Sequence, residues 1–321
     1  MTGEWRKALQ IADKHTPDVD RVFTHAVRDL RRTIDPKPLK EALSRGDTLA
    51  AINSIPWQHF SQDLQGLKLE YQQIFRDGGA QAAKSVPPMK RKVHKTFYPL
   101  DKAYTELDVQ YVSDLMDPRA VKWVNEFGAE RIRYIDQETR AGVKAILDES
   151  LSEGQTVQWQ AQQIRELIGL DPRRGKAYYA RLKGLQQSGL STEKIQAQIQ
   201  AYGRKLLRDR ADTISRTETM TALNEARRES WIQARDKGYL PGHWVMEWLT
   251  KPDDRLCLIC QGMDGDRAEL EGQFKDGASL PKHPRCRCVS LLVRVDEATG
   301  NLAAYQSPIS PAYWDVAQAP S

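Results

Sequence analysis

Apolar side chains recur at steps of three and four residues over long stretches of the first 117 residues, which is the spacing of amphipathic helices. One apolar stripe lies in 18–34 and a second in 57–77. Their members are Val19, Val22, Phe23, Ala26 and Leu30 in the first, and Phe60, Leu64, Leu67, Tyr71 and Phe75 in the second. The "DPKP" at 35–38 ends the first helix, and Gly78 and Gly79 are expected to end the second. The pattern therefore predicts a helical N-terminal region over residues 1–117.

The segment 84–99 interrupts this pattern with two prolines and a group of basic side chains. They are Pro87, Pro88, Lys84, Lys90, Arg91, Lys92 and Lys95. This composition is typical of a solvated basic linker. The alternative is an arm that contacts nucleic acid or an acidic partner surface.

The helical pattern returns more strongly between about 118 and 240. In 128–154 the apolar stripe consists of Ile132, Ile135, Thr139, Val143, Ile146 and Leu151. Gly154 is expected to close this helix, and Thr156 is expected to cap the next one.

A later helix, 208–238, has an inner face that is too polar for a simple apolar stripe, because Thr217, Thr221 and Asn224 share it with Ile214. Buried polar groups need hydrogen-bond partners. We therefore predict a structural network that joins this helix to the segments after it. The side chains assigned to the network are Arg216, Glu218, Asn224 and Asp254, with Arg216 and Glu218 largely buried.

The character of the sequence changes after Gly238. "GHWVMEWLT" and "VSLLVRV" at 289–295 are both rich in aromatic and β-branched residues and predict two strands. The expected fold class is mainly α, with a small α+β C-terminal module clipped by zinc. The expected domains are the helical region 1–117, a domain over 118–296 and a flexible tail over 297–321.

Composition narrows the class of protein. Apolar residues make up 40% of the chain and charged residues 28%, as in globular proteins. The net charge of +5 is mild for a dedicated nucleic-acid binder. The sequence shows neither an apolar run long enough to span a membrane nor a secretory signal at its start, so we expect a protein kept in a reducing cytoplasm, without membrane contact.

The four cysteines form two tight clusters, which in a reducing compartment favours metal ligation over disulfides. Cys257 and Cys260 form a C-x-x-C pair, while Cys286 and Cys288 follow His283 closely. Two such pairs complete a tetrahedral zinc site. Cys257, Cys260 and Cys286 are the firmest ligands, and Cys288 and His283 are alternatives for the fourth position. Buried thiols without metal, or a disulfide in an oxidised sample, are the competing interpretations.

A thiolate-rich ligand set is the usual choice for structural zinc, whereas a catalytic zinc keeps an open position for water. We therefore expect the metal to hold a loop that has little core of its own. No residue is assigned a catalytic role, and no further cofactor is expected.

Three stretches together resemble the phage Mu F-like minor head proteins, a family also called head morphogenesis proteins. They are "RADTISRTETMTALNEARRESWIQARDKGY", "WLTKPDDRLCLICQGMDGDRAELEGQF" and "LPKHPRCRCVSLL". The features that match are the helix motif Arg216-Thr217-Glu218, Asn224, Asp264-Gly265 and the closing "HP-x-CRC". The resemblance covers about residues 120 to 293, and the order of the motifs makes it specific. The chain departs from the family's commoner "ARTE" helix motif by having Ser215 at the first position.

The resemblance implies a minor capsid component of a tailed phage, located in the capsid interior or at the portal vertex, and in the host cytoplasm during assembly. Its implied partners are the portal protein and the major capsid protein, with packaged DNA as a further contact. Its implied role is head assembly, extending to genome packaging or delivery, without enzymatic activity. A zinc-dependent nuclease and a DNA-binding module are the alternative functions.

Overall fold

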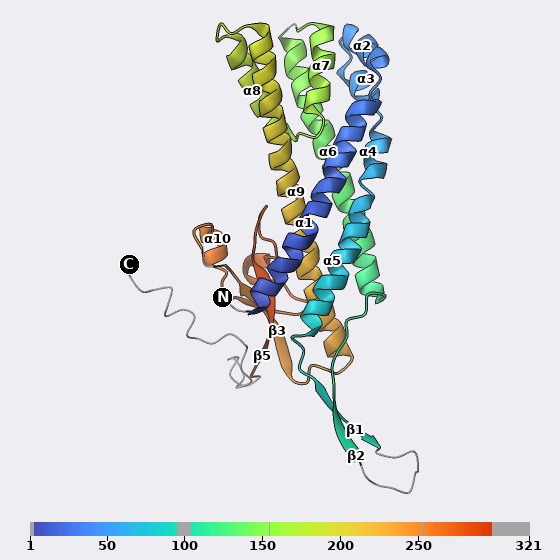
Figure 1. Ribbon diagram of the computed structural model, residues 1–321, viewed down its shortest axis with the longest axis vertical. Coiled ribbons are helices and arrows are strands. Elements are labelled where there is room, and N and C mark those ends of the chain that lie inside the picture. Colours follow the sequence, from blue (N-terminus) through green and yellow to red (C-terminus); the bar gives the residue numbers. More distant parts are fainter. Residues whose placement is uncertain (1–2, 95–103, 154, 252, 297–321) are drawn as a thin grey trace, which may run out of the picture. The chain divides into compact units, whose positions relative to one another are not determined.

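The computed structural model describes residues 3–94, 104–153, 155–251 and 253–296. The protein is mainly helical and has a small sheet near its C-terminus (Figure 1), as the sequence predicts. The helices are α1 (Gly3–Thr33), α2 (Pro36–Ser44), α3 (Thr48–Asn53), α4 (Trp57–Asp63), α5 (Gly66–Ala83), α6 (Pro118–Ser152), α7 (Val157–Leu167), α8 (Pro172–Gln186), α9 (Thr192–Asp236) and α10 (Leu258–Gln261). The strands are β1 (Met89–His94), β2 (Tyr104–Val109), β3 (His243–Leu249), β4 (Arg267–Glu269) and β5 (Val289–Val295).

Short polar side chains cap several of these helices by accepting hydrogen bonds from backbone N–H groups in the first turn. Thr156 caps α7 as predicted, and Asp171 caps α8 in the same way. The predicted closure by Gly154 lies outside the described residues. Of the described helices, none is long and apolar enough to cross a membrane.

The chain folds into two compact units, each built from separate stretches of sequence. The Cys unit comprises the described parts of 1–16, 71–123 and 216–321, and the helical unit comprises 17–70 and 124–215. The chain passes from one unit to the other inside α1, α5, α6 and α9. These boundaries do not coincide with the division at residue 117 expected from the sequence, and the autonomy of 1–117 as a domain stays a prediction. The tail 297–321 lies outside the described residues.

The helical unit packs apolar stripes around a core that includes Phe23, Leu30 and Leu64. It also buries the guanidinium of Arg210, which is 3% exposed and donates to Thr139 Oγ1 at 3.0 Å. Burial lowers the pKa of Arg210 to about 10, against which nearby Asp171 acts. Within this unit α2 lies beside α3 (Figure 1).

The Cys unit contains a three-stranded antiparallel sheet in the order β4-β3-β5. The two strands predicted from sequence, β3 and β5, pair from His243↔Val295 to Leu249↔Val289. Alternation along β3 directs Trp244, Met246 and Trp248 into the main core of this unit, which also contains Trp231 of α9. The opposite face forms a smaller apolar cluster of Val245, Leu291, Val293 and Val295.

Gly78 and Gly79 were expected to end a helix, and this prediction is wrong because both lie inside α5. The reason is close packing against α9. A Cβ atom built at Gly78 would lie 2.8 Å from Leu223 Cδ1 and 3.2 Å from Ala226 Cβ. The glycine thus permits helix contact instead of stopping the helix.

The basic segment 84–99 is not simply a linker. Its residues 89–94 form β1, which pairs antiparallel with β2 from Met89↔Val109 to His94↔Tyr104. Lys90, Arg91 and Lys92 therefore lie on a strand of a two-stranded antiparallel sheet. Lys95 lies outside the described residues.

Candidate metal centre and its support on helix α9

The first cysteine pair is positioned by the short helix α10. Cys257 is its N-cap residue, and its Sγ accepts a hydrogen bond from the N–H of Cys260 at 3.4 Å. This arrangement turns both thiols toward one place, while Leu258 and Ile259 between them remain 84% and 60% exposed.

The second group of donors lies on a tight turn. The N–H of Cys286 donates to the carbonyl of His283 at 3.1 Å. Pro284 occupies the second position of this turn, and Arg285 at the third has a φ of 62°, a combination typical of a type II turn. The turn brings His283 and Cys286 back to the same side of the chain.

The structure gathers all five predicted ligand residues. His283 Nε2 lies 3.2 Å from both Cys257 Sγ and Cys260 Sγ, and Cys260 Sγ lies 3.7 Å from Cys286 Sγ. The donor atoms form two groups that share Cys260, one with Cys257 and His283 and one with Cys286 and Cys288. Each group spans no more than 4.8 Å. All four cysteines are free thiols, so the disulfide alternative is not what the structure contains.

These separations match a tetrahedral metal site. Sulfur atoms bound to zinc at about 2.3 Å in a tetrahedron lie about 3.8 Å apart. The Cys260–Cys286 separation of 3.7 Å is close to that value. The assignment of zinc, and the choice between His283 and Cys288 as fourth ligand, stay predictions.

The imidazole of His283 is oriented by the backbone. Its Nδ1 lies 2.8 Å from the carbonyl oxygen of Pro284. A carbonyl can only accept, so Nδ1 carries the proton and Nε2 faces the two thiols. A second hydrogen bond of this kind is the usual way in which a metal-binding histidine is held.

The thiols affect one another's protonation. A hydrogen bond from Cys288 is the largest influence that lowers the pKa of Cys286, which falls to about 5. Burial raises the pKa of Cys260 to about 12, and the hydrogen bond to Cys286 raises the pKa of Cys288. The cluster thus holds a thiolate most readily at Cys286. A bound cation would remove the mutual repulsion that opposes further ionisation.

Helix α9 holds the second group through its polar face. Thr217 Oγ1 accepts from the N–H of Arg285 at 3.0 Å. Seven residues later Asn224 donates from Nδ2 to the carbonyl of Cys288 at 3.2 Å and accepts at Oδ1 from the N–H of Ser290 at 3.1 Å. The helix thus binds the backbone on both sides of Cys286.

Arg227 extends this support. Its guanidinium is fully buried and donates from Nη2 to the carbonyl of Ser290 at 3.0 Å, and Nη1 donates to Gln81 Oε1. Burial lowers its pKa to about 10. Sequence reasoning did not select Arg227. The signal that could have found it is its place three residues after Asn224, on the same face of the helix.

The structure buries two members of the predicted polar network and exposes the other two. Asn224 and Glu218 are buried, and Glu218 accepts from Tyr71 Oη at 3.3 Å. The expected burial of Arg216 is wrong, because Arg216 is exposed. Residues two apart on a helix point about 200° apart, so Arg216 and Glu218 lie on different faces.

Asp254 is also exposed, and its neighbour Asp253 makes the contacts in its place. Asp253 accepts from both terminal nitrogens of Arg287 at 2.6 and 2.7 Å and lies 3.1 Å from Lys251 Nζ. These hydrogen bonds, foremost that of Arg287, hold the pKa of Asp253 well below its usual range. The pair ties the loop before Cys257 to the residue between Cys286 and Cys288.

Comparison with known proteins now identifies this region. Residues 180–291 match the family model of the phage Mu protein F like proteins. This region is similar to the phage Mu F-like proteins. The match includes α9, β3, the five donor residues and most of the sheet, so the Mu F-like region contains the entire cluster and its helical support. Residues 120–179, which also resemble the family by eye, lie outside the match. No curated protein and no solved structure matches the chain.

Proposed function

We propose that the protein is a non-catalytic minor head protein of a tailed phage, which binds the portal protein and the major capsid protein during head assembly and stays in the virion. The observation that carries the proposal is the Mu F-like match over residues 180–291. A role at the portal vertex, in genome packaging or in delivery is the finer part of the proposal and rests on the family resemblance.

The use of the polar side chains of α9 supports a structural role. Thr217, Asn224 and Arg227 are bonded to backbone groups of residues 285–290. Side chains that serve catalysis generally converge on a cleft in which substrate can reach them. Here they hold one segment of chain against a helix.

We infer that Cys257, Cys260 and Cys286 hold one structural zinc ion, with His283 or Cys288 as the fourth ligand. The donors are soft thiolates and an imidazole, which favour zinc over hard cations such as Mg²⁺. The ion would join α10 to the turn at 283–286, two segments connected otherwise by a long excursion of chain. When bound, it would supply cross-linking of this region rather than Lewis-acid chemistry.

The geometry argues against the zinc-nuclease alternative. Glu218 is buried and bonded to Tyr71, Arg216 is exposed on another face, and His283 is bonded at Nδ1 to its own turn. These three residues would have to converge on one substrate to act as a catalytic group. The ion pairs of Asp253 with Arg287 and Lys251 argue against the DNA-binding alternative, because they neutralise basic side chains near the cluster that would otherwise attract phosphates.

The experiment mixes the full-length chain separately with portal protein, with major capsid protein and with duplex DNA at physiological salt. We expect a stable complex with the portal protein, and DNA binding that is weak and declines steeply with salt. Tight DNA binding or cleavage without any portal complex would overturn the proposal. As a control for nuclease activity, Cys260→Ser should leave a trace activity unchanged if that activity is a contaminant.

A further inference from the structure

The helical unit has a strongly basic surface on α8 and the first part of α9. Residues 172–208 contain nine lysines and arginines and one acidic residue, a formal charge of +8, whereas the whole chain has a net charge of only +5. The rest of the chain is therefore slightly acidic, and the basic excess of the protein is concentrated in this stretch. A local excess of this kind is typical of a surface that meets a polyanion.

Helices α8 and α9 pack against each other in an antiparallel pair (Figure 1). Near the start of α8, Nη2 of Arg174 lies 2.6 Å from Oδ2 of Asp209 in α9. One turn further along α8, Tyr178 lies against an earlier part of α9, where a Cβ atom built at Gly203 would lie 3.0 Å from its Cε2 atom. The basic surface thus belongs to two packed helices and not to an extended arm.

One exposed face of α9 contains four of the cations. Its positions follow one another at steps of three or four residues, or are adjacent, which places them on one side of the helix. The members of this α9 basic face are Lys194, Ala197, Gln198, Ala201, Arg204, Lys205 and Arg208. The face contains no carboxylate, and at 1.5 Å per residue it extends over about 21 Å.

The fold leaves most of these cations without a counter-charge. Arg174 and Lys183 are ion-paired with carboxylates. The other seven cations of 172–208 are exposed and form no ion pair with any described residue; they are Arg173, Lys176, Arg181, Lys194, Arg204, Lys205 and Arg208. The one acidic residue of the stretch, Glu193, accepts hydrogen bonds from its own backbone N–H and from Ser191, which lower its pKa. It is therefore engaged at the start of the helix.

These unpaired cations also repel one another. Arg204 and Arg208 are four positions apart on α9, and like charges at this spacing destabilise a helix. Lys205 lies beside both on the same face. A polyanion bound along this face would remove the repulsion.

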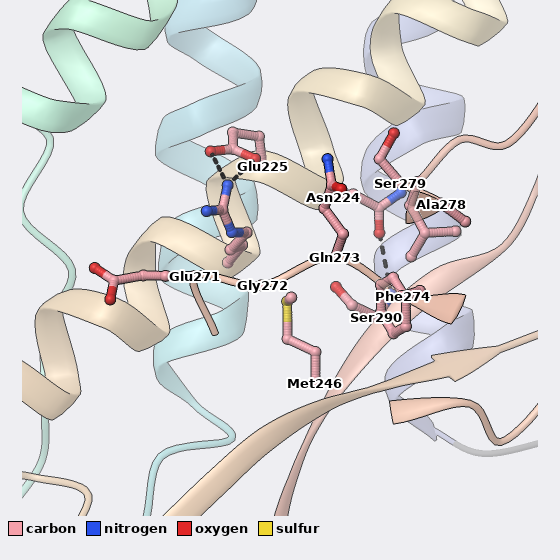
Figure 2. A pocket seen from close by; sticks show the side chains of 12 residues that line it. Asn224, Glu225, Met246, Glu271, Gly272, Gln273, Phe274, Ala278, Ser279 and Ser290 are labelled. Atoms are coloured by element: carbon pink, nitrogen blue, oxygen red, sulfur yellow. Dashed lines mark hydrogen bonds and ion pairs between the residues drawn. The ribbon is translucent and has the colours of Figure 1, made fainter. Parts of the chain in front are cut away.

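The cations at the cleft and at the cluster of the Cys unit are neutralised instead. Beside the cleft drawn in Figure 2, Nη1 of Arg228 bonds both carboxylate oxygens of Glu225, at 3.0 and 3.1 Å. Arg287 is paired with Asp253. Cations that already have a carboxylate partner attract a polyanion weakly. The α9 basic face is therefore the better candidate for such a contact.

We propose that the α9 basic face, together with the unpaired cations of α8, contacts the phosphate backbone of duplex DNA without reading its sequence. The residues 172–208 are described in full, and none of their large hydrophobic or aromatic side chains is exposed. A protein partner would need apolar or aromatic anchors, and a single strand would need aromatic rings for stacking. Lysines, arginines and a glutamine suit phosphate oxygens. The proposed function supplies only the source of the duplex, which is the packaged genome.

The test follows the fluorescence anisotropy of a labelled duplex of about 24 base pairs, titrated with the full-length chain at about 50 to 200 mM salt. For the unmodified chain, the logarithm of the affinity should fall linearly with the logarithm of the salt concentration. In the triple variant Arg204→Gln, Lys205→Gln and Arg208→Gln, this slope should decrease by about 2 to 3, because each phosphate contact contributes about 0.9. The affinity at about 50 mM salt should fall at least about 10-fold. The melting temperature should not fall, since these side chains form no ion pair in the fold.

A matched control variant removes three positive charges elsewhere. It combines Lys7→Gln, Arg21→Gln and Lys144→Gln, three exposed cations that are each paired with a carboxylate of their own helix. This variant has the same net charge as the triple variant of the α9 basic face. It should keep the salt slope and should bind the duplex within about threefold of the unmodified chain, because distant surface charges are screened by salt.

Four results would overturn the inference. Equal losses in the two variants would show only an effect of net charge, and no binding of the duplex by the unmodified chain at about 50 mM salt would remove the contact itself. Tighter binding of a single strand than of the duplex would exclude a duplex surface. A triple variant that keeps DNA binding and loses a complex with portal or capsid protein would assign the face to an acidic protein. Failure of the unmodified chain to bind portal protein would count against the proposed function alone.

Discussion

The side chain of Asn224 and the backbone of Ser290 are bonded as two neighbouring strands would be. The N–H of Ser290 donates to Oδ1 of Asn224 at 3.1 Å, and Nδ2 of the same side chain donates to the carbonyl of Cys288 at 3.2 Å. A helix thereby provides hydrogen bonds to the start of β5. Because Thr217 lies seven residues earlier on the same helical face and bonds Arg285, the helix fixes the spacing of the whole cysteine-bearing segment.

Replacing Asn224 with Ala should cost about 2 to 6 kcal/mol of unfolding free energy, because two buried backbone groups lose their partner at about 1 to 3 kcal/mol each. Thr221→Ala is the control, since Thr221 Oγ1 bonds a carbonyl of its own helix, and it should change stability by about 0.5 kcal/mol or less. Urea unfolding of both variants measures the difference. Equal losses in the two variants would show that Asn224 does not support the segment.

Two glycine substitutions should have opposite effects. Gly78→Ala places a Cβ atom 2.8 Å from Leu223 Cδ1 and should destabilise the protein by about 1 to 3 kcal/mol. Gly184→Ala, in α8, meets no atom within 4 Å and should stabilise it by about 0.5 to 1 kcal/mol through helix propensity. Thermal melts of the two variants check both signs. A stabilising Gly78→Ala would mean that α5 and α9 do not pack as closely as described.

The carboxyl group of Asp77 should make the free energy of unfolding depend on pH. Burial raises its pKa, but hydrogen bonds from Lys14, His15 and Arg76 outweigh burial and lower the pKa from 3.8 to about 2. A carboxyl group with a lowered folded-state pKa stabilises the fold above its unfolded pKa, and this contribution is lost as the pH falls toward about 2.

Asp77→Asn should therefore lower the urea midpoint at pH 5, and the gap from the unmodified chain should shrink between about pH 4 and pH 2. Asp13→Asn, a carboxylate at an exposed position of α1, serves as the control and should show no such narrowing. A constant gap over this range would rule out Asp77 as the titrating group.

Removal of the metal should lower the thermal stability of the Cys unit. Protein purified without chelator should contain about one zinc ion per chain, and a strong chelator should lower its melting temperature. Cys257→Ser should lower the metal content and make stability insensitive to chelator. A metal-free chain with unchanged melting temperature would show that the thiols are simply buried side chains.

Local pattern was sufficient for much of the fold. Alternating apolar residues predicted β3 and β5, and the polar face of 208–238 indicated that Asn224 would be buried and bonded. The clustering of Cys257, Cys260, His283, Cys286 and Cys288 followed from spacing alone.

What the sequence could not supply depended on contacts between distant segments. Gly78 continues a helix because Leu223 packs against it, and no local signal reveals that neighbour. Asp253 rather than Asp254 bonds Arg287, since the backbone direction in that loop decides which of two adjacent carboxylates points inward. The predicted burial of Arg216 failed because the prediction grouped residues from two faces of one helix, and Arg216 lies on the exposed face.

Quantitative mass spectrometry of purified phage heads tests the central claim most directly. The account predicts that this chain is present in heads at a small, fixed ratio to the portal protein, and that heads made without portal protein lack it. Absence of the chain from heads, together with a DNA-cleaving activity that follows the purified chain and is lost in Glu218→Ala, would contradict it.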